Sequence, residues 1–588
     1  MKYLVTITIL FALSLPATSA VTAPLVNQMS HAPSPYLQQH AKDKVHWQTW
    51  SPASLALAKQ QRKPILLSIG YYACHWCHVM QQESYQNDAV AELLNEFYIP
   101  IKIDRELEPG LDQAMLSYAK SLIGIAGWPL NVYLTSDARP FDAHVYLDAP
   151  SLTTRLEANQ RTTSAITATN LVSPTQLSQN NLINKPNSLG FAQSALSQID
   201  PLNGGFVGTR KFPQTPQLQA ISHYLRHTPE PELTAWLNHT LSQMTNNGLY
   251  DSVNGGFFRY TVDSEWRIPH FEKMLVDNAQ LWQLYSQLAQ RESSTEWSMI
   301  AEQTLNFMLT YLYDAHNGAF FTSLSALDKQ GHEGGHYLWT LAQLRQKLSP
   351  AELALVNQDW QLAYPPSFDA GYLPIWGDHS RTDKPRQAIY ERLQQARASV
   401  SIDTDRKRLV SYNGLMLSLL SQQLKNQPQL KSITTKLVNF IRQSWQDGKL
   451  SQGNYGNKIL AEADFEGYAF AAKGLIDYAI ITGDVDATEL SIALLQRSKT
   501  LFVTDAGFIA QAAIGDFSLP REAAFADTAL ISPTSIWIEA CLQSRQPLLV
   551  KQAEQRLKQA HTLMQESPLE YASLWALYWK WQSFLPLD

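Results

Sequence analysis

Two of the chain's three cysteines, Cys74 and Cys77, stand three positions apart, soon after an apolar run that ends at residue 70. If this run is a strand and residues 77–85 form a helix, Cys74 lies at the N-terminus of that helix. Free backbone N–H groups and the helix dipole favour a thiolate there. A chain of 588 residues with so few cysteines is not stapled by disulfides. The pair is therefore interpreted as a redox dithiol, in which Cys74 attacks and Cys77 resolves the mixed disulfide.

Two other kinds of site are compatible with the same pattern. His78 follows Cys77 and completes the Cys-x-x-Cys-His pattern of covalent haem attachment, but its place after a buried strand leaves little room for a haem. A zinc site would use both cysteines with His75 or His78. Structural zinc usually takes two separated pairs of ligands, and the chain has no second Cys-x-x-Cys. No metal and no cofactor are therefore predicted.

Trp128 and Pro129 favour the redox interpretation. They directly precede a predicted strand, the place where thioredoxin-like folds hold a cis-proline opposite the dithiol. Together with His75 and Trp76, which lie between the cysteines, they are the predicted substrate-binding residues of the dithiol.

The first part of the chain alternates between strand and helix patterns, which predicts an α/β domain over residues 30–148. The expected strands cover residues 65–69, 99–104, 131–135 and 144–147, and the expected helices cover residues 88–97 and 111–122. Residues 149–188 are rich in Thr, Ser, Asn and Gln with little periodicity, and we expect a linker or a loosely packed excursion there.

Residues 189–588 read as a succession of amphipathic helices, and a Gly-aromatic motif returns between them. The copies are Gly204-Gly205-Phe206, Gly255-Gly256-Phe257, Gly318-Ala319-Phe320, Gly371-Tyr372 and Gly507-Phe508. Their spacing, with one larger gap, is about that of a helical hairpin with its loops. This pattern predicts an all-α domain of repeated hairpins, either closed into a ring or open as a solenoid.

The beginning of the chain predicts export. Lys2 precedes an apolar stretch over residues 3–15, and small residues follow up to position 20, which is typical of a cleaved secretory signal over residues 1–20. The stretch is too short for a comfortable membrane span, so no stable membrane anchor is expected. A periplasmic or secreted location follows. The net charge of −6 and the lack of a long basic run give no reason to expect nucleic acid.

Several segments closely resemble the spermatogenesis-associated, thioredoxin-like domain family. They are Ser34–His40, Lys63–Met80, Ile101–Glu106, Gly127–Asn131, Gly204–Phe206, Lys211–Pro213, Gly248–Asp251, Gly255–Asp263, Trp266, Pro269–Leu275, Asp277 and Asn413–Met416. The resemblance implies a thioredoxin-like domain fused to an (α/α)6 helical toroid of the six-hairpin glycosidase type. One departure concerns Ser68, because typical thioredoxins carry a buried acid there, six residues before the first cysteine. The proton acceptor for the resolving thiol must then come from elsewhere.

A second set of polar residues is expected at the mouth of the toroid, where carboxylates could perform acid–base chemistry on a sugar. The candidates are Arg259, Tyr260, Asp263, Trp266, His270, Glu272, Lys273 and Asp277, with Asp464 and Glu466 as a second acidic group. The alternative is structural: Glu272 begins a helix, while Arg259 and Asp263 form an ion pair that braces the loop. The sequence assigns no spacing to any pair of carboxylates, so both alternatives stay open.

Two functions of different classes follow. The first is an exported thiol-disulfide oxidoreductase, with a redox partner protein or client, whose toroid binds a carbohydrate or that client. The alternative is a carbohydrate-active enzyme, glycosidase- or epimerase-like, or a sugar-binding protein with an accessory thioredoxin-like domain.

Overall fold

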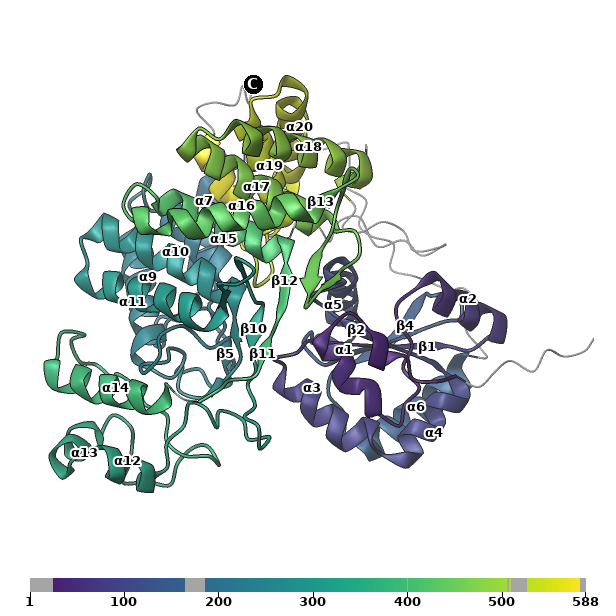
Figure 1. Ribbon diagram of the computed structural model, residues 1–588, viewed down its shortest axis with the longest axis horizontal. Coiled ribbons are helices and arrows are strands. Elements are labelled where there is room, and N and C mark those ends of the chain that lie inside the picture. Colours follow the sequence, from purple (N-terminus) through teal and green to yellow (C-terminus); the bar gives the residue numbers. More distant parts are fainter. Residues whose placement is uncertain (1–24, 164–185, 399, 505–506, 509–525, 582–588) are drawn as a thin grey trace, which may run out of the picture.

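The computed structural model describes residues 25–163, 186–398, 400–504, 507–508 and 526–581. The predicted signal segment 1–20 and residues 164–185 of the predicted linker lie outside this part. The chain folds into an α/β domain that lies beside a larger helical domain (Figure 1). Short strands of the helical domain, among them β10 (Ser323–Leu324), β11 (Thr404–Asp405) and β12 (Lys407–Leu409), lie on the side that faces the α/β domain.

The α/β domain is built on a four-stranded sheet with the order β2-β1-β3-β4. The strands are β1 (Ile65–Gly70), β2 (Ile99–Asp104), β3 (Leu130–Leu134) and β4 (Pro140–His144). β1 pairs in parallel with β2, and β3 runs antiparallel to both of its neighbours. The apolar runs of β1, β2 and β3 are wholly buried because helices cover both faces of the sheet. This is a thioredoxin-like arrangement, as predicted.

The helices of this domain divide between the two faces of the sheet. α2 (Pro52–Gln61) and α5 (Pro109–Ile123) share one apolar core with alternate residues of the strands. α3 (His75–Met80), α4 (Asp88–Phe97) and α6 (Ala149–Thr163) contribute to the core on the other face. The predicted helices at 88–97 and 111–122 are confirmed.

Two expectations for the end of this domain differ from the structure. The fourth strand covers residues 140–144 rather than 144–147, and residues 149–163 of the predicted linker form the helix α6. Over residues 149–161 of α6, only Leu152 and Leu156, four positions apart, are fully buried among many polar residues. The helical periodicity of the sequence is therefore weak. Arg155 also forms a hydrogen-bonded ion pair with Asp142 of β4, which ties α6 to the sheet.

The helical domain is a closed ring rather than an open solenoid. Its inner helices are α8 (Thr215–Tyr224), α10 (Leu275–Glu292), α15 (Val410–Gln423), α17 (Phe465–Thr482), α19 (Pro533–Ser544) and α21 (Ala572–Trp581). Each packs against the next, and α21 packs back against α8. Outside them lie α7 (Ser188–Leu196), α9 (Pro231–Asn246), α11 (Thr295–Phe307), α16 (Lys431–Ser444), α18 (Val485–Phe502) and α20 (Pro547–Glu566). This is the predicted (α/α)6 toroid.

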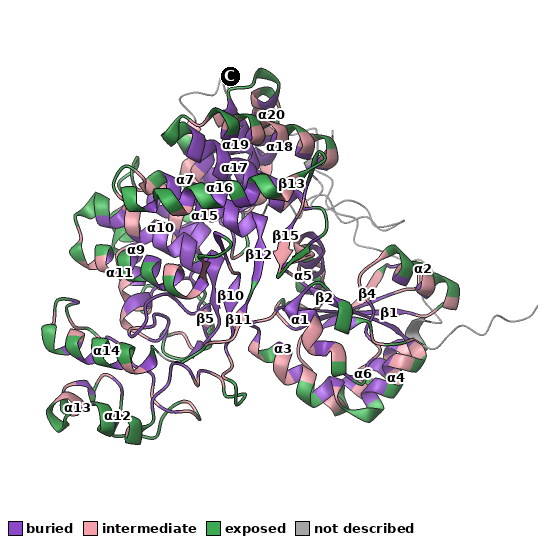
Figure 2. Ribbon diagram, in the orientation of Figure 1, coloured by how far each residue is buried: buried purple, intermediate pink, exposed green. Residues whose placement is uncertain are grey.

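The inner helices are buried on most of their surface, as the purple ribbons of α15 and α17 show (Figure 2). These two helices cross with very little space between their backbones. A Cβ on Gly474 of α17 would lie 2.4 Å from the carbonyl oxygen of Gly414 of α15. Glycine at both positions therefore permits the close packing of these neighbouring helices.

The Gly-aromatic motif is a repeated turn held by an ion pair. In three copies an Asp four residues before the glycine accepts backbone N–H groups of the turn, and a later cation binds the same carboxylate. The pairs are Lys211 with Asp200 at 2.7 Å, Lys273 with Asp251 at 2.8 Å, and Arg408 with Asp314 at 2.9 Å. The first glycine of each motif has a positive φ, between 68° and 75°. Lys273 therefore belongs to the architecture of the repeat.

The copy at Gly371 does not belong to this repeat. It lies in a separate lobe with α12 (Leu341–Lys347), α13 (Pro350–Val356) and α14 (Lys384–Arg397), which stands apart at the lower left of Figure 1. Tyr372 pairs there with Trp339, and the lobe has an apolar core around Trp360, Trp376 and Tyr390. This insertion accounts for the irregular spacing of the motif.

Candidate functional site

The dithiol lies at the start of α3, as predicted. Cys74 is the N-cap residue of this helix, its Sγ accepts the backbone N–H of Cys77 at 3.1 Å, and the two cysteines form a disulfide. Both cysteines are only 2% exposed. The Trp128–Pro129 peptide bond is cis, as the sequence predicted. A thiolate at Cys74 would be stabilised by the N–H groups of the first turn of α3.

A buried lysine, Lys102, contacts Ser68, which lies six residues before Cys74. The ammonium of Lys102 donates to the Ser68 hydroxyl at 3.0 Å, and that hydroxyl also bonds the hydroxyl of Tyr85 at 2.9 Å. The Nζ of Lys102 lies within 5.6 Å of three aromatic ring centroids, those of Tyr36, Trp47 and Tyr85. Burial lowers the pKa of Lys102 to about 7, with Asp43 opposing the shift. A titratable amine is therefore buried beside Ser68 and the ring of Tyr36.

Glu272 of the toroid reaches the first turn of α3. Its carboxylate accepts the backbone N–H of His75 at 3.4 Å and the Tyr71 hydroxyl at 2.6 Å. Arg259 forms an ion pair with the same carboxylate at 3.2 Å and also bonds the Tyr71 hydroxyl. Burial raises the pKa of Glu272, and Arg259 opposes the rise. The toroid thus places a carboxylate next to the helix end that carries Cys74.

The side chains between the cysteines also meet the toroid. The His75 ring stacks on His270 with the centroids 5.5 Å apart. Glu333 bonds His270 and lies 3.5 Å from the Nε2 of His75. Burial lowers the pKa of His75, and Glu333 opposes the fall. Trp76, 38% exposed, lies 5.1 Å from Tyr146 and 6.4 Å from His270, measured between ring centroids.

Two arginines from different domains hold Trp128. The guanidinium of Arg105, which follows β2, lies 4.1 Å from the ring centroid of Trp128, and that of Arg259 lies 4.9 Å away. The indole N–H of Trp128 donates to Asp112 of α5 at 2.7 Å. Burial raises the pKa of Asp112 to about 6, with Arg105 opposing. The cis-proline segment is therefore fixed from both the thioredoxin-like domain and the toroid.

A buried ion cluster joins the two domains beside this site. Lys407 of β12 contacts Asp104 at the end of β2, Glu106 at 2.9 Å and Asp405 of β11 at 3.2 Å. The Lys407 and Asp405 side chains are fully buried. Burial raises the pKa of Asp405, and the charge of Lys407 opposes the rise. The cluster fixes the end of the strand that precedes Arg105.

Two more acids of the toroid candidate set, Asp277 and Glu466, interact with Arg105 of the same junction. Burial raises the pKa of Asp277 to about 6, while Arg259 and Arg105 oppose the shift. Burial, and then the charge of Asp464, raises the pKa of Glu466, with Arg105 again among the opposing groups. Asp464 itself is the N-cap of α17 and accepts the Gly467 N–H at 3.1 Å.

Some of the candidate residues have structural roles in the toroid. Asp263 accepts backbone N–H groups of its own loop, including that of Arg267 at 2.9 Å. Trp266 is fully buried and donates its indole N–H to the Asn203 carbonyl at 2.9 Å. Tyr260 stacks on the half-exposed Phe212 at the rim of the toroid. The structure therefore brings Arg259, His270, Glu272, Asp277 and Glu466 to the dithiol side, whereas Asp263, Trp266 and Lys273 brace loops.

The sequence predicted no functional role for several residues of the junction. Tyr71, Lys102 and Arg105 belong to segments used for the family resemblance but were given no role. Glu333 lies in the loop before the small lobe, far from the dithiol in sequence, and no motif pointed to it. Only contacts between distant segments bring these side chains together.

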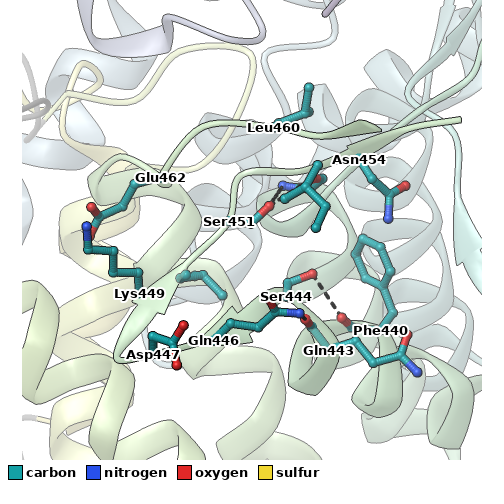
Figure 3. Close-up of a pocket in the computed structure, with 13 residues that line it drawn as sticks. Phe440, Gln443, Ser444, Gln446, Asp447, Lys449, Ser451, Asn454, Leu460 and Glu462 are labelled. Atoms are coloured by element: carbon teal, nitrogen blue, oxygen red, sulfur yellow. Dashed lines mark hydrogen bonds between the residues drawn. The ribbon is translucent and has the colours of Figure 1, made fainter. Parts of the chain in front are cut away.

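A separate pocket lies in the toroid, among the hairpins formed by β13 (Trp445–Gln446), β14 (Lys449–Leu450), β15 (Gly453–Tyr455) and β16 (Lys458–Ile459). Its volume is about 660 Å³, and Asp447, Lys449 and Glu462 are among the side chains that line it (Figure 3). None of the predicted site residues lines this pocket.

The third cysteine, Cys541, is unpaired and fully buried in α19, as a small apolar residue would be. Within the described ranges, no group of three or more His, Cys, Asp or Glu side chains is placed to hold a metal ion. None of the helices described here has the length and apolar character that a membrane span requires.

Comparison with known sequences confirms the family resemblance. Residues 26–179 match the family model Thioredox_DsbH, described as a protein of unknown function, DUF255. The chain is similar to spermatogenesis-associated protein 20 from Homo sapiens, with 28% identity over 576 residues that cover 83% of this chain and 72% of that protein. The protein of the same name from Mus musculus is 34% identical over 354 residues, which cover 55% of this chain and 44% of its own length.

Comparison with solved structures finds separate likenesses to the two domains. A structure titled "DsbH Oxidoreductase" matches 20% of this chain and 85% of its own, with 16% identity and a TM-score of 0.17. A sugar epimerase from a ruminal bacterium matches 56% of this chain and 89% of its own, with 15% identity and a TM-score of 0.30. Both TM-scores are low, so these structures do not carry the fold assignment. The strand order β2-β1-β3-β4 and the closed ring of helices carry it.

Proposed function

We propose that this chain is a thiol-disulfide oxidoreductase whose Cys74–Cys77 pair works at the junction between a thioredoxin-like domain and a helical toroid. The observation that carries the proposal is the disulfide at the N-terminus of α3, with the Sγ of Cys74 bound to the backbone N–H of Cys77. The composition of residues 1–20 supports the further proposal that the protein is exported to the periplasm or secreted.

The chemistry proceeds by two exchanges. The Cys74 thiolate attacks a substrate disulfide, forms a mixed disulfide and releases one substrate thiolate. The Cys77 thiolate then attacks the sulfur of Cys74, which closes the Cys74–Cys77 disulfide and releases the second substrate thiolate. The reverse sequence oxidises a substrate dithiol and leaves both cysteines reduced. Each direction moves two electrons and needs no bound cofactor.

Thiol trapping tests the proposal. The full-length Cys541→Ala variant is equilibrated across a series of glutathione ratios, quenched with acid and labelled with a maleimide that adds mass to each free thiol. We expect Cys74 and Cys77 to gain label together, at one midpoint. If the pair takes the label at no ratio, or never returns to the disulfide, the redox proposal is wrong.

The carboxylate of Glu272 is expected to destabilise the thiolate form of Cys74 and so to raise the pKa of its thiol. A negative charge at the first turn of α3 opposes the helix dipole, so Glu272→Gln should lower the pKa of the Cys74 thiol by roughly one unit. The measurement is the pH dependence of iodoacetamide labelling at Cys74 in the reduced protein. Glu265→Gln is the matched control, because Glu265 lies on the same toroid segment with its side chain 60% exposed. A pKa of Cys74 that does not fall would contradict this role.

A second function is favoured by two buried acids, Asp277 and Glu466, that both interact with the charge of Arg105. Burial raises the pKa values of both Asp277 and Glu466 near Arg105, which suits proton transfer to or from a bound sugar. A carbohydrate-active or sugar-binding toroid would then bind a glycan beside the dithiol. Glycan binding by the purified protein that is lost in both Asp277→Asn and Glu466→Gln would support this function. Binding that both variants retain would remove these residues from it.

A further inference from the structure

The hydroxyl of Tyr36 is a buried donor without a partner. Tyr36 lies in α1 (Pro35–Gln39), a short helix whose N-cap Ser34 accepts the Leu37 N–H at 3.3 Å. The residue is 1% exposed, and in the described part of the chain its hydroxyl forms no hydrogen bond. An unsatisfied buried hydroxyl costs about 1–3 kcal/mol, so its retention calls for a physical reason.

This hydroxyl lies next to the resolving cysteine. Both groups border Gly70. A Cβ on Gly70 would stand 2.2 Å from the hydroxyl oxygen of Tyr36 and 2.8 Å from the Sγ of Cys77. The absence of a side chain at Gly70 therefore lets the oxygen and the sulfur lie close together. Since Cys77 is 2% exposed, protein groups rather than solvent must stabilise any charge on this sulfur.

The amine of Lys102 also lies against the ring of Tyr36. The Nζ of Lys102 lies 5.6 Å from the ring centroid of Tyr36 and donates its one described hydrogen bond to Ser68. Its other contacts are to the faces of Trp47 and Tyr85. The titratable groups that surround Tyr36 and Cys77 are His40, Asp43, His78, Tyr85, Lys102 and Asp104.

We propose that Tyr36 is the hydrogen-bond donor to the sulfur of Cys77 whenever the Cys74–Cys77 bond is open. When a substrate thiolate attacks Cys74, a new S–S bond forms between substrate and Cys74, and the old bond breaks with its electron pair left on the Sγ of Cys77. The O–H of Tyr36 then donates to this thiolate. The Tyr36 proton stays on its oxygen, and the thiolate is stabilised where water does not reach.

The inference rests on the proposed redox function and deepens it. A stabilised Cys77 thiolate is a better leaving group, so the disulfide opens faster. It also stabilises the reduced protein relative to the disulfide form, which makes the pair more oxidising. Tyr36 thereby gives a role to the Ser34–His40 segment, which carried the family resemblance without any assigned chemistry.

The test removes only the hydroxyl. In the Cys541→Ala background, Tyr36→Phe is expected to shift the equilibrium with glutathione roughly tenfold toward the disulfide, which is about 30 mV. In the Cys74→Ser, Cys541→Ala background, where Cys77 is the one thiol left, Tyr36→Phe should raise the pKa of Cys77, followed by thiolate absorbance. Tyr133→Phe is the matched control, since Tyr133 is buried in the same domain and its hydroxyl bonds His144 at 3.2 Å.

A second variant keeps the inference testable if Tyr36→Phe folds poorly. Tyr36→Phe combined with the stabilising Lys102→Met, compared with Lys102→Met alone, is expected to raise the pKa of Cys77 in the same single-thiol background. If neither variant raises this pKa, the inference is wrong. The titration of Cys77 needs no turnover, so its outcome is distinct from that of the redox proposal, which fails only if the wild-type pair does not interconvert.

Discussion

Replacing Lys407 with Met is expected to lower the free energy of unfolding by about 3–5 kcal/mol. The ammonium of Lys407 is the shared partner of Asp104, Glu106 and Asp405, and all four side chains are at most 1% exposed. Without the lysine, three acids remain together in a site that water does not reach. Urea unfolding at pH 7, followed by tryptophan fluorescence, measures the change.

A triple variant separates two effects of Lys407→Met on stability. One is the loss of the contacts that Lys407 makes, and the other is the cost of leaving buried acids without a cation. Adding Glu106→Gln and Asp405→Asn to Lys407→Met removes two of the uncompensated charges and should recover most of the lost stability. Asp104 keeps its hydrogen bond from Ser34 in this background. If Lys407→Met unfolds at the same urea concentration as the wild type, the cluster does not hold the two domains together.

The local parts of the site could be predicted from the sequence because local physics determines them. The apolar run before Cys74 predicted β1, and the spacing to Cys77 predicted a cysteine at the N-cap of α3. The position of Pro129 before a strand predicted the cis bond. Helical periodicity and a returning turn predicted an all-α domain of repeated hairpins, and the family resemblance implied that it closes as a toroid. The packing of α21 on α8 confirms the closed ring.

The composition of the junction could not be predicted, because it depends on contacts between remote segments. Glu272 meets the backbone of His75 from almost two hundred positions away, and Lys407 meets Asp104 from about three hundred. No periodicity or motif encodes such pairs. The same limit applied to Lys102, whose alternating position on β2 suggested only a buried strand. Lys102 is unusual because Ser68 stands where typical thioredoxins carry a buried acid. The amine of Lys102 therefore has no carboxylate partner at that position.

The two domains therefore form one candidate site rather than two. Toroid groups that the sequence assigned to a separate mouth, above all Arg259, His270 and Glu272, contact the residues that flank Cys74. A substrate of the dithiol that contacts the partly exposed Trp76 would lie close to both domains, because the buried His270 of the toroid packs beside Trp76. Under the proposed function, the toroid contributes charge and surface to a redox reaction carried out by the smaller domain.

Lys102→Met is expected to stabilise the oxidised protein by about 2–4 kcal/mol at pH 6, because the native state holds a buried amine without a carboxylate partner. The pKa of Lys102 is about 7 in the folded protein and lies near 10.5 in an exposed lysine. Below pH 7 the amine is charged in both states, and the full cost of burying that charge is present.

Between pH 7 and about 10.5 the unfolded chain keeps the Lys102 proton that the folded protein has released, so the wild type gains stability as the pH rises. The advantage of Lys102→Met should therefore be largest at pH 6 and much smaller at pH 9, where urea unfolding of both proteins measures it. Lys44→Met is the control, since the Lys44 side chain is 47% exposed in the same domain. An equal advantage at both pH values would show that Lys102 keeps its proton in the fold.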